Sequence, residues 1–450
     1  MHKKMRSPPR RLHANVTPVI KWGARHLVAI VGVCGFAGYL WLFTRSSADE
    51  PIRSDGYNYY LYAPSWLIYH DPTLEALAKD WYDGAYPGFS GILRWPGTNR
   101  WSNRHPIGVA VLMFPFVIVA DLLTRWSNLP RDGFSFYYQH AAALAGLAYF
   151  LAGLAVLRRT LSRYFSPAVT LWTLVAITWG TNLFHYAVYD GTFSHAFSFA
   201  LICALVELTD LWWAQPRRWH AVTLGFVAAL IVLTRHTNGL FLLLVPLWHV
   251  TAWRQLGGRI NELWKRRGAV LAMAAVAAAA AAPQLVLYKA TTDRWLVNTY
   301  APHGLGFTFL TPHLFGAFFS TQRGLFFWSP VLLFAVAGMF VARGWARQVL
   351  APSAVVLALN AWLVASWMEW QYGASYGHRA FIDSLGVLAV FLAAFFAWTS
   401  EHPRLLPWVA GATTIATALS VVQMIQYWLR VWPVRDITWA QYRSLFLTFP

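Results

Sequence analysis

The feature that most constrains this chain is a series of apolar runs long enough, or nearly long enough, to cross a lipid bilayer. A helical crossing needs about 20 predominantly apolar residues. The 450 residues are 57% hydrophobic and only 12% charged, with 26 Trp and 30 Phe, which is more apolar surface than a soluble domain buries. The sequence therefore predicts an all-α, polytopic transmembrane helical bundle. The expected spans are 27 to 43, 136 to 157, 168 to 185, 193 to 213, 221 to 233, 240 to 251, 268 to 288, 324 to 341, 349 to 367, 383 to 398 and 405 to 428.

One further apolar run, 106 to 123, is ambiguous, and its placement decides the orientation of everything after it. If this run lies along the membrane interface, the later basic clusters all fall on the side of the N-terminus. If it crosses, several of them fall outside. The positive-inside rule favours the first arrangement, with a juxtamembrane helix in the run. The clusters are Arg158, Arg159 and Arg163; Arg217 and Arg218; Arg254, Arg259, Lys265, Arg266 and Arg267; and Arg343 and Arg347.

This arrangement predicts a single integral membrane domain over 1–450 with about eleven spans, located in the plasma membrane. The basic segment 1–26 lies in the cytoplasm, and 44–135 is the first outer loop, with interfacial helices. The formal charge of +18 is explained by topology, so no nucleic-acid partner is expected. Cys34 and Cys203 lie inside apolar runs and offer no disulfide or metal framework.

Four polar stretches are predicted on the outer face, where 14 of the 18 acidic residues fall. A carboxylate follows the first span in the stretch Ser-Asp-Gly with an aromatic tail, and an Arg-His-Pro-Ile-Gly stretch opens the run at 106. A second carboxylate lies between two spans, and a late Tyr-Gly-x-x-x-Gly-His-Arg stretch precedes a span. These stretches contain Asp55 and Tyr59; Arg104 and His105; Asp190 and His195; and Tyr372, His378 and Arg379.

In this order and on one face, these stretches resemble the polyprenol-dependent GT-C glycosyltransferases. That superfamily includes the protein O-mannosyltransferases and the aminoarabinose transferases of lipid A. The resemblance implies a membrane enzyme that moves a sugar from a polyprenyl-phosphate donor to a glycan, lipid or protein acceptor on the outer side. It also implies that Asp55 takes the acceptor proton. Many relatives have an Asp-Glu pair at this place, whereas here Asp55 is followed by Gly56.

The chemistry of sugar transfer independently requires a base and a group that binds the departing phosphate. A positioned carboxylate accepts the proton of the attacking hydroxyl, and an arginine stabilises the departing phosphate without losing its own proton. We assign these roles to Asp55 and Arg379. Nearby aromatic side chains stack on the sugar and exclude water. The supporting substrate-binding residues are predicted to be Asp190, His195, Arg104, His105, Tyr372, His378 and Tyr59.

Each assignment has a structural alternative. Asp55 is also the residue type that starts a turn before glycine, and Asp190 is placed to cap the helix that begins near Phe193. Arg379 is equally suited to anchoring at the headgroups or pairing with Asp383.

Other polar residues have simpler expected roles. Arg104 and His105 suit headgroup contacts. Arg235 lies between two short apolar runs and is expected to face a cavity. Glu207 and Asp210 are expected to be solvated near an inner helix end. No metal or other cofactor is predicted, because no histidine pair has the spacing of a helical metal site.

Two other function classes remain open. A transporter or lipid-linked sugar flippase would carry charged groups near the middle of the bilayer and broken helices in related halves. The short runs on either side of Arg235 are the one feature in its favour. A non-catalytic assembly subunit would require neither Asp55 nor Arg379.

Overall fold

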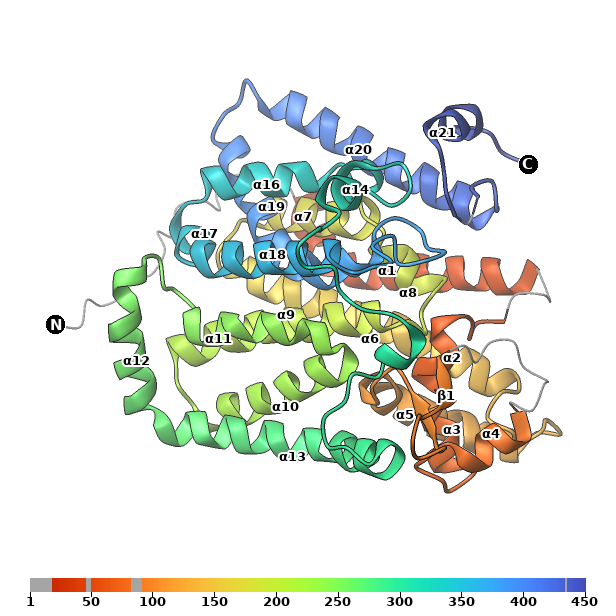
Figure 1. Ribbon diagram of the computed structural model, residues 1–450. Helices are drawn as coiled ribbons and strands as arrows, with labels where there is room; N and C mark the ends of the chain where they lie inside the picture. The colour runs from red at the N-terminus through yellow and green to blue at the C-terminus, as the bar shows by residue number, and fades with distance from the viewer. Residues whose placement is uncertain (1–17, 46–49, 82–90, 434) are drawn as a thin grey trace.

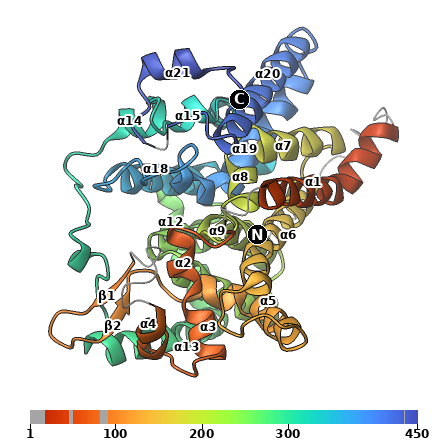
Figure 2. The ribbon, with the colours of Figure 1, turned by 90° about the vertical axis from the view of Figure 1, so that its right-hand side faces the viewer.

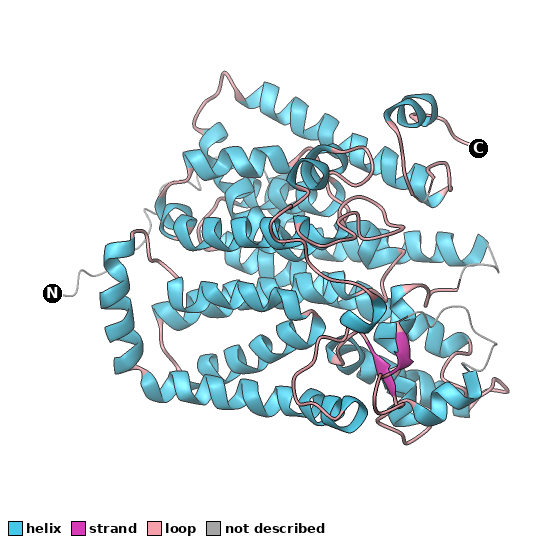
Figure 3. Cartoon of the chain, in the orientation of Figure 1, coloured by secondary structure: helices cyan, strands magenta, loops and turns pink. Residues whose placement is uncertain are grey.

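A computed structural model describes residues 18–45, 50–81, 91–433 and 435–450. The described part of the chain is helical apart from one two-stranded sheet (Figure 3). Its antiparallel strands, β1 (Ile92–Arg94) and β2 (Trp101–Asn103), pair Ile92 with Asn103. The predicted all-α class is therefore confirmed in outline. Most of the predicted basic segment, and the parts of the first loop at 46–49 and 82–90, lie outside the described residues.

Seven helices of the described chain are long and apolar enough to cross a membrane. These helices are α1 (Pro18–Arg45), α5 (Gly108–Arg125), α6 (Phe136–Ser162), α9 (Ser194–Ala214), α13 (Arg267–Thr292), the continuous pair η4 (Arg379–Ser384) and α19 (Leu385–Ser400), and α20 (Leu406–Trp428). The shorter apolar helices are α7 (Pro167–Trp179), α10 (Arg218–Thr234), η1 (His236–Leu243) with α11 (Leu244–Leu247), α16 (Leu332–Val341) and α18 (Leu350–Ala365). Helices of this length and composition are typical of a multi-pass membrane protein.

The remaining elements are short and connect or cover these helices. They are α2 (Asp55–Tyr60), α3 (Tyr62–Leu67), α4 (Glu75–Trp81), α8 (Leu183–Val188), η2 (Trp253–Gln255), α12 (Leu256–Lys265), η3 (Ala301–His303), α14 (Leu314–Phe319), α15 (Leu325–Trp328), α17 (Gly344–Gln348) and α21 (Trp439–Leu445). Helices α2 to α4 and the sheet lie at one end of the bundle, which we call the site end, and α12 lies at the opposite end (Figure 1). Figure 2 looks onto the site end.

Glycines allow three of the most extensive helix pairs to approach closely. A Cβ added at Gly338 of α16 would lie 1.9 Å from the Phe391 carbonyl oxygen of α19. An added Cβ at Gly225 of α10 would lie 2.3 Å from the Met273 carbonyl oxygen of α13. Gly153 makes the same kind of contact between α6 and α9. Small residues at crossings are how membrane helices gain packing contacts, since lipid provides no hydrophobic drive for helix association.

Helix α5 has both of its ends at the site end of the bundle. Helix α6 runs antiparallel to α1, because His140 in its first turn contacts Tyr39 and Arg158 near its end donates to the Ala24 carbonyl. Asp121, in the last turn of α5, accepts a hydrogen bond from Tyr138 in the first turn of α6, at 2.7 Å. The first residue of α5, Gly108, packs against Leu233 at the end of α10. This geometry agrees with a juxtamembrane helix in the run 106 to 123, although α5 is long enough to span.

The break between α10 and η1 follows the predicted bent pair. Helix α10 ends at Thr234, Arg235 is extended with φ −153° and ψ 117°, and the chain resumes as the 3₁₀ helix η1. The short apolar runs at 221 and 240 therefore form two abutting, interrupted helices. Neither alone reaches the length of a complete crossing.

At the opposite end, Glu207 and Asp210 of α9 are buried, which corrects the expectation that they are solvated. Their exposed fractions are 5% and 2%. Both accept from Arg163, at 2.6 Å and 3.0 Å, and neither is bonded to Arg217 or Arg218. A buried carboxylate is tolerated only with such partners, because it loses its hydration. These residues therefore tie α6 to α9.

Candidate active site

Three predicted residues from distant parts of the chain contact one another at the site end. Asp55 is the first residue of α2, and its Oδ1 accepts from Arg104 Nη2 at 2.9 Å. Its Oδ2 accepts from Arg379 Nη2 at 2.8 Å. The Asp55 side chain retains 18% exposure, and those of Arg104 and Arg379 retain 17% and 12%. Asp55 is thus clamped by two guanidinium groups and remains accessible.

Local structure fixes where each of these groups lies. Arg104 follows strand β2, its N–H donates to the Gly91 carbonyl, and its own carbonyl accepts from Thr299 Oγ1 at 2.8 Å. Arg379 begins η4, directly after a turn in which Gly377 has φ 57°. That left-handed conformation suits glycine, which has no Cβ to clash. The sheet and the turn thus bring the two arginines to Asp55 from different elements.

His105 extends this cluster without adding a charge. Its Nε2 lies 3.9 Å from Asp55 Oδ1, its ring centroid lies 4.1 Å from that of Tyr59, and its Nδ1 contacts the Tyr300 hydroxyl at 3.2 Å. Burial lowers the pKa of His105 to about 3, against the opposing effect of Asp55. His105 is therefore neutral at neutral pH.

The pKa of Asp55 is set by opposing effects of burial and charge. Burial alone would raise this pKa, but the nearby Arg379 and Arg104 guanidinium groups hold it well below its usual value. Asp55 is therefore ionised at neutral pH. A carboxylate paired with two arginines is a weak base until at least one of them is drawn away.

A second charged cluster is centred on Asp383 and contains His195. Asp383 Oδ2 accepts from Arg235 Nη1 at 3.0 Å, and Asp383 Oδ1 lies 3.3 Å from His195 Nδ1. Arg235 is therefore paired with Asp383, whereas the sequence predicted that it faces a cavity. The alternative pairing of Arg379 with Asp383 is wrong, since Arg379 pairs with Asp55.

The predicted residues Tyr372 and His378 lie between these two clusters. The His378 ring is 1% exposed and packs between Tyr372 and Phe381, at centroid distances of 5.6 Å and 4.7 Å. Neither ring nitrogen has a hydrogen-bond partner among the described residues. Burial, together with Arg323 and Arg379, lowers the pKa of His378 to about 3. His378 is therefore a neutral ring surrounded by cationic side chains.

Asp190 takes part in a separate network and does not cap a helix. The N-cap of α9 is Phe193, which makes no side-chain cap bond, so the predicted capping role is wrong. Asp190 instead accepts from Arg53 Nε at 3.0 Å and lies 2.9 Å from His185 Nε2. Because Trp428 Nε1 donates to His185 Nδ1, His185 presents its Nε2 proton to Asp190. This network joins the first loop to α8 and α20.

Sequence reasoning missed Arg53 and Tyr300 as parts of these clusters, and it named Asp383 only as an alternative partner of Arg379. Arg53 was the one detectable signal, as a basic residue two positions before Asp55. The positions of Asp383 and Tyr300 depend on tertiary packing, and no local pattern marks them.

Packing against Thr192 explains why glycine follows Asp55. A Cβ at residue 56 would lie 2.1 Å from Thr192 Oγ1 and 3.0 Å from its Cβ. A side chain at residue 56 would therefore clash with the loop after Asp190. The Asp55-Gly56 pair is a consequence of the close approach of α2 to this loop.

Gly56→Ala is expected to destabilise the protein by about 1–3 kcal/mol, the usual cost of overpacking. The measurement is the thermal unfolding midpoint of the purified protein in detergent. Gly257→Ala is the control, because Gly257 lies in α12 with no atom within 4 Å of an added Cβ. Equal midpoints for the two variants would contradict the packing explanation.

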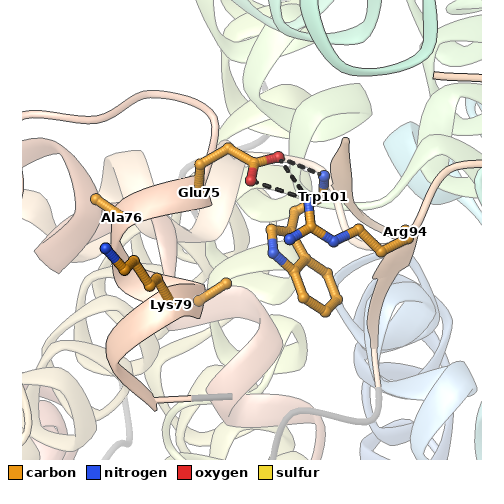
Figure 4. Close-up of a pocket in the computed structure, with 6 residues that line it drawn as sticks. Glu75, Ala76, Lys79, Arg94 and Trp101 are labelled. Carbon is orange, nitrogen blue, oxygen red and sulfur yellow. Dashed lines mark hydrogen bonds and ion pairs between the residues drawn. The ribbon is translucent and has the colours of Figure 1, made fainter. Parts of the chain in front are cut away.

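Two cavities lie away from Asp55. The larger, of about 350 Å³, lies between α4 and the sheet, where the Glu75 carboxylate accepts from the Trp101 backbone N–H at 2.9 Å and from Arg94 at 3.0 Å (Figure 4). The smaller, of about 180 Å³, is lined by Gln322, Arg323, Glu369, Gln371, Gly373, Arg435 and Asp436. The described residues contain no group of three or more His, Cys, Asp or Glu side chains placed to hold a metal ion.

Comparisons of the chain with protein-family models, with curated proteins and with solved structures find no match.

Proposed function

We propose that the protein is an inverting membrane glycosyltransferase of the GT-C type, which transfers a sugar from a polyprenyl-phosphate donor to a glycan, lipid or protein acceptor. The observation that carries the proposal is the contact of Asp55 with Arg104 and Arg379, three residues that come together across 324 positions of sequence. A carboxylate beside two arginines at the end of a membrane-type bundle supplies both a base and an anion-binding group.

The proposed topology has about eleven spans, a cytoplasmic N-terminus and an active site on the outer face of the plasma membrane. Support comes from the basic residues at the end opposite to Asp55. Arg158 contacts the start of α1, Arg163 the end of α9, and Arg259 the Trp248 carbonyl beside α12. The positive-inside rule assigns that end to the cytoplasm and the site end to the outer face.

The proposed reaction is a single displacement at the anomeric carbon of the donor. The acceptor hydroxyl oxygen forms a bond to this carbon and loses its proton to Asp55. The bond from the anomeric carbon to the phosphate oxygen breaks, and its electron pair stays on that oxygen as polyprenyl phosphate leaves. General-base assistance contributes about 10² to 10⁴ in rate. Arg379 stabilises the charge that develops on the phosphate.

The other residues of the cluster position these two groups. Arg104 holds Asp55 Oδ1 and is itself fixed by the sheet and Thr299. Tyr59, His105 and Tyr300 form a neutral, largely aromatic wall beside the carboxylate, which suits stacking against a sugar ring. His195 contacts Asp383, Tyr372 lies beside Arg235, and His378 packs against Tyr372. Asp190 has a structural role in this scheme, because Arg53 and His185 occupy it.

A transporter is the second candidate, favoured by the interrupted helices around Arg235. This arginine is partly buried and contacts Asp383 and His195 where α10 ends and η1 begins. Charged groups at helix breaks are typical of transport sites. In a transporter, replacement of Asp55 or Arg379 would alter the movement of a substrate and would form no new glycosidic bond.

Arg379→Gln is expected to lower sugar transfer by about 10² to 10³, the cost of removing one group that stabilises developing negative charge. The measurement is mass spectrometry of envelope glycans and lipid-linked sugars in cells lacking the protein and given back each variant at equal membrane levels. Arg343→Gln is the control, since Arg343 is 69% exposed and pairs with Glu401 at the opposite end. An Arg379→Gln strain with wild-type glycans would exclude the proposed phosphate-binding role.

A further inference from the structure

Both oxygens of the Asp55 carboxylate are engaged in the structure. Arg104 binds Oδ1 and Arg379 binds Oδ2, at 2.9 Å and 2.8 Å. A general base must accept a hydrogen bond from the hydroxyl that it deprotonates, within about 2.6 to 3.2 Å. The same pairing leaves each arginine holding a carboxylate in place of a phosphate. In the described conformation two guanidinium groups therefore weaken the base, and Arg379 holds a carboxylate where the proposed reaction needs a phosphate.

The two arginines differ in how firmly their surroundings hold them. Arg104 has its backbone tied to Gly91 and Thr299, and its Nε lies 3.3 Å from His105 Nε2. Arg379 has a buried Nε with no hydrogen-bond partner among the described residues. A buried donor without an acceptor is unfavourable, and a further anionic oxygen would satisfy it. Arg379 is therefore the arginine with a donor left for another anion.

The position of Arg379 also suits a lipid-borne anion. It is the first residue of the continuous apolar segment Arg379–Ser400, which is long enough to cross a bilayer. Its guanidinium lies over the Phe193 ring, with the Cζ atom 5.2 Å from the centroid. A phosphate carried on a lipid would arrive at the level of such a helix end, where arginine contacts headgroups.

We propose that the phosphate of the lipid donor replaces Asp55 on Arg379, so that Asp55 stays on Arg104 and its freed Oδ2 becomes the base. This inference rests on the proposed function and adds an order of binding. The donor must bind before the acceptor hydroxyl can be deprotonated. Asp55 thus acts as an internal competitor for the phosphate, and Arg104 is a positioning residue.

The exchange predicts that loss of the carboxylate strengthens phosphate binding. Asp55→Asn removes the negative charge that competes for Arg379, and the affinity for undecaprenyl phosphate is expected to rise by about tenfold, roughly the effect of one charge-assisted hydrogen bond. Arg379→Gln is expected to lower this affinity by about tenfold or more. Arg104→Gln is expected to change the affinity by less than about threefold, because Arg104 stays with Asp55 and does not bind the phosphate.

The experiment measures binding to the full-length, detergent-purified protein by native mass spectrometry. Three probes are used at equal concentrations: undecaprenyl phosphate, undecaprenol and inorganic phosphate. Glu75→Gln is the matched control, because Glu75 is also a site-end carboxylate bonded to an arginine, Arg94, in a separate cluster. The control is expected to bind all three probes as the wild type does.

The outcomes separate this inference from the proposed function. Tighter binding of undecaprenyl phosphate by Asp55→Asn alone supports the exchange. An affinity of Asp55→Asn for undecaprenyl phosphate that is equal to or lower than that of the wild type overturns it. An equal rise in affinity in Glu75→Gln also overturns it. If neither the wild type nor any variant distinguishes undecaprenyl phosphate from undecaprenol, the proposed donor and the exchange are both overturned. If inorganic phosphate binds as well as the lipid and shows the same gain, exchange at Arg379 stands and a lipid source is overturned.

Discussion

Asp55→Asn is expected to reduce sugar transfer by at least about 10²-fold, because an amide cannot accept the acceptor proton. The substitution keeps the size of the side chain and one oxygen able to accept from Arg104 or Arg379, while its amide NH2 group cannot accept from the other arginine. The measurement is the amount of transferred sugar in envelope glycans, by mass spectrometry, in cells that carry only the variant.

Two comparisons make this result specific to the base. Membrane levels of the variant must match those of the wild type, and Glu75→Gln, at the same end of the bundle, should restore full transfer. Accumulation of the lipid-linked sugar donor in the Asp55→Asn strain would identify the sugar. Wild-type transfer by Asp55→Asn would sink the catalytic assignment, leaving Asp55 as a residue that only holds two arginines.

Asp210→Ala is expected to lower the free energy of unfolding by about 3–5 kcal/mol, the cost of breaking a buried ion pair from one side. Asp210 accepts from four groups on three parts of the chain. These are Arg163 Nη2 at 3.0 Å, Tyr164 Oη at 2.6 Å, Trp248 Nε1 at 3.1 Å and Trp345 Nε1 at 2.9 Å. Removal of the carboxylate leaves the buried indole N–H groups of Trp248 and Trp345 without their acceptor and takes away one of the two carboxylates that Arg163 binds.

The readout is the thermal unfolding midpoint and the yield of folded protein in detergent. Glu262→Ala is the matched control, because Glu262 lies at the same end, is 55% exposed and pairs with Arg259 on its own helix. Because the Glu262 carboxylate keeps most of its hydration, its pair contributes little, about 0–1 kcal/mol. If the two variants unfold at the same temperature, the Asp210 network does not stabilise the bundle.

The positions of the helices follow from local sequence. Apolar runs such as 136 to 157 and 193 to 213 contain enough hydrophobic side chains to define a helix in lipid, where the backbone must satisfy its own hydrogen bonds. The bent pair of helices on either side of Arg235 was also predictable from the sequence, because each apolar run is too short to cross a membrane. Contacts place both ends of α5 at the site end, as the interfacial prediction expects, while the length and composition of α5 equally fit a membrane crossing.

The candidate site was only partly readable in the same way. Asp55, Arg104 and Arg379 stood out as charged residues next to apolar runs, because a charge near lipid is costly and calls for a reason. Their pairing was not readable, since the three lie up to 324 positions apart and no periodicity relates them. For the same reason Arg379 was assigned Asp383 as an alternative partner, whereas Arg235 holds that acid.

The sequence by itself determined that the chain is an apolar helical bundle, where its long helices lie, and which polar residues are unusual. These properties depend on hydrophobicity and helix length, which are local. The expected spans 168 to 185 and 324 to 341 are wrong as continuous helices, since each is split in two. The tertiary structure alone decided the partners of the charged groups: Arg104 and Arg379 for Asp55, Arg53 and His185 for Asp190, and Arg163 for Asp210. A buried charge takes whichever opposite charge the folded helices bring within about 4 Å, and that choice is made only when the helices pack.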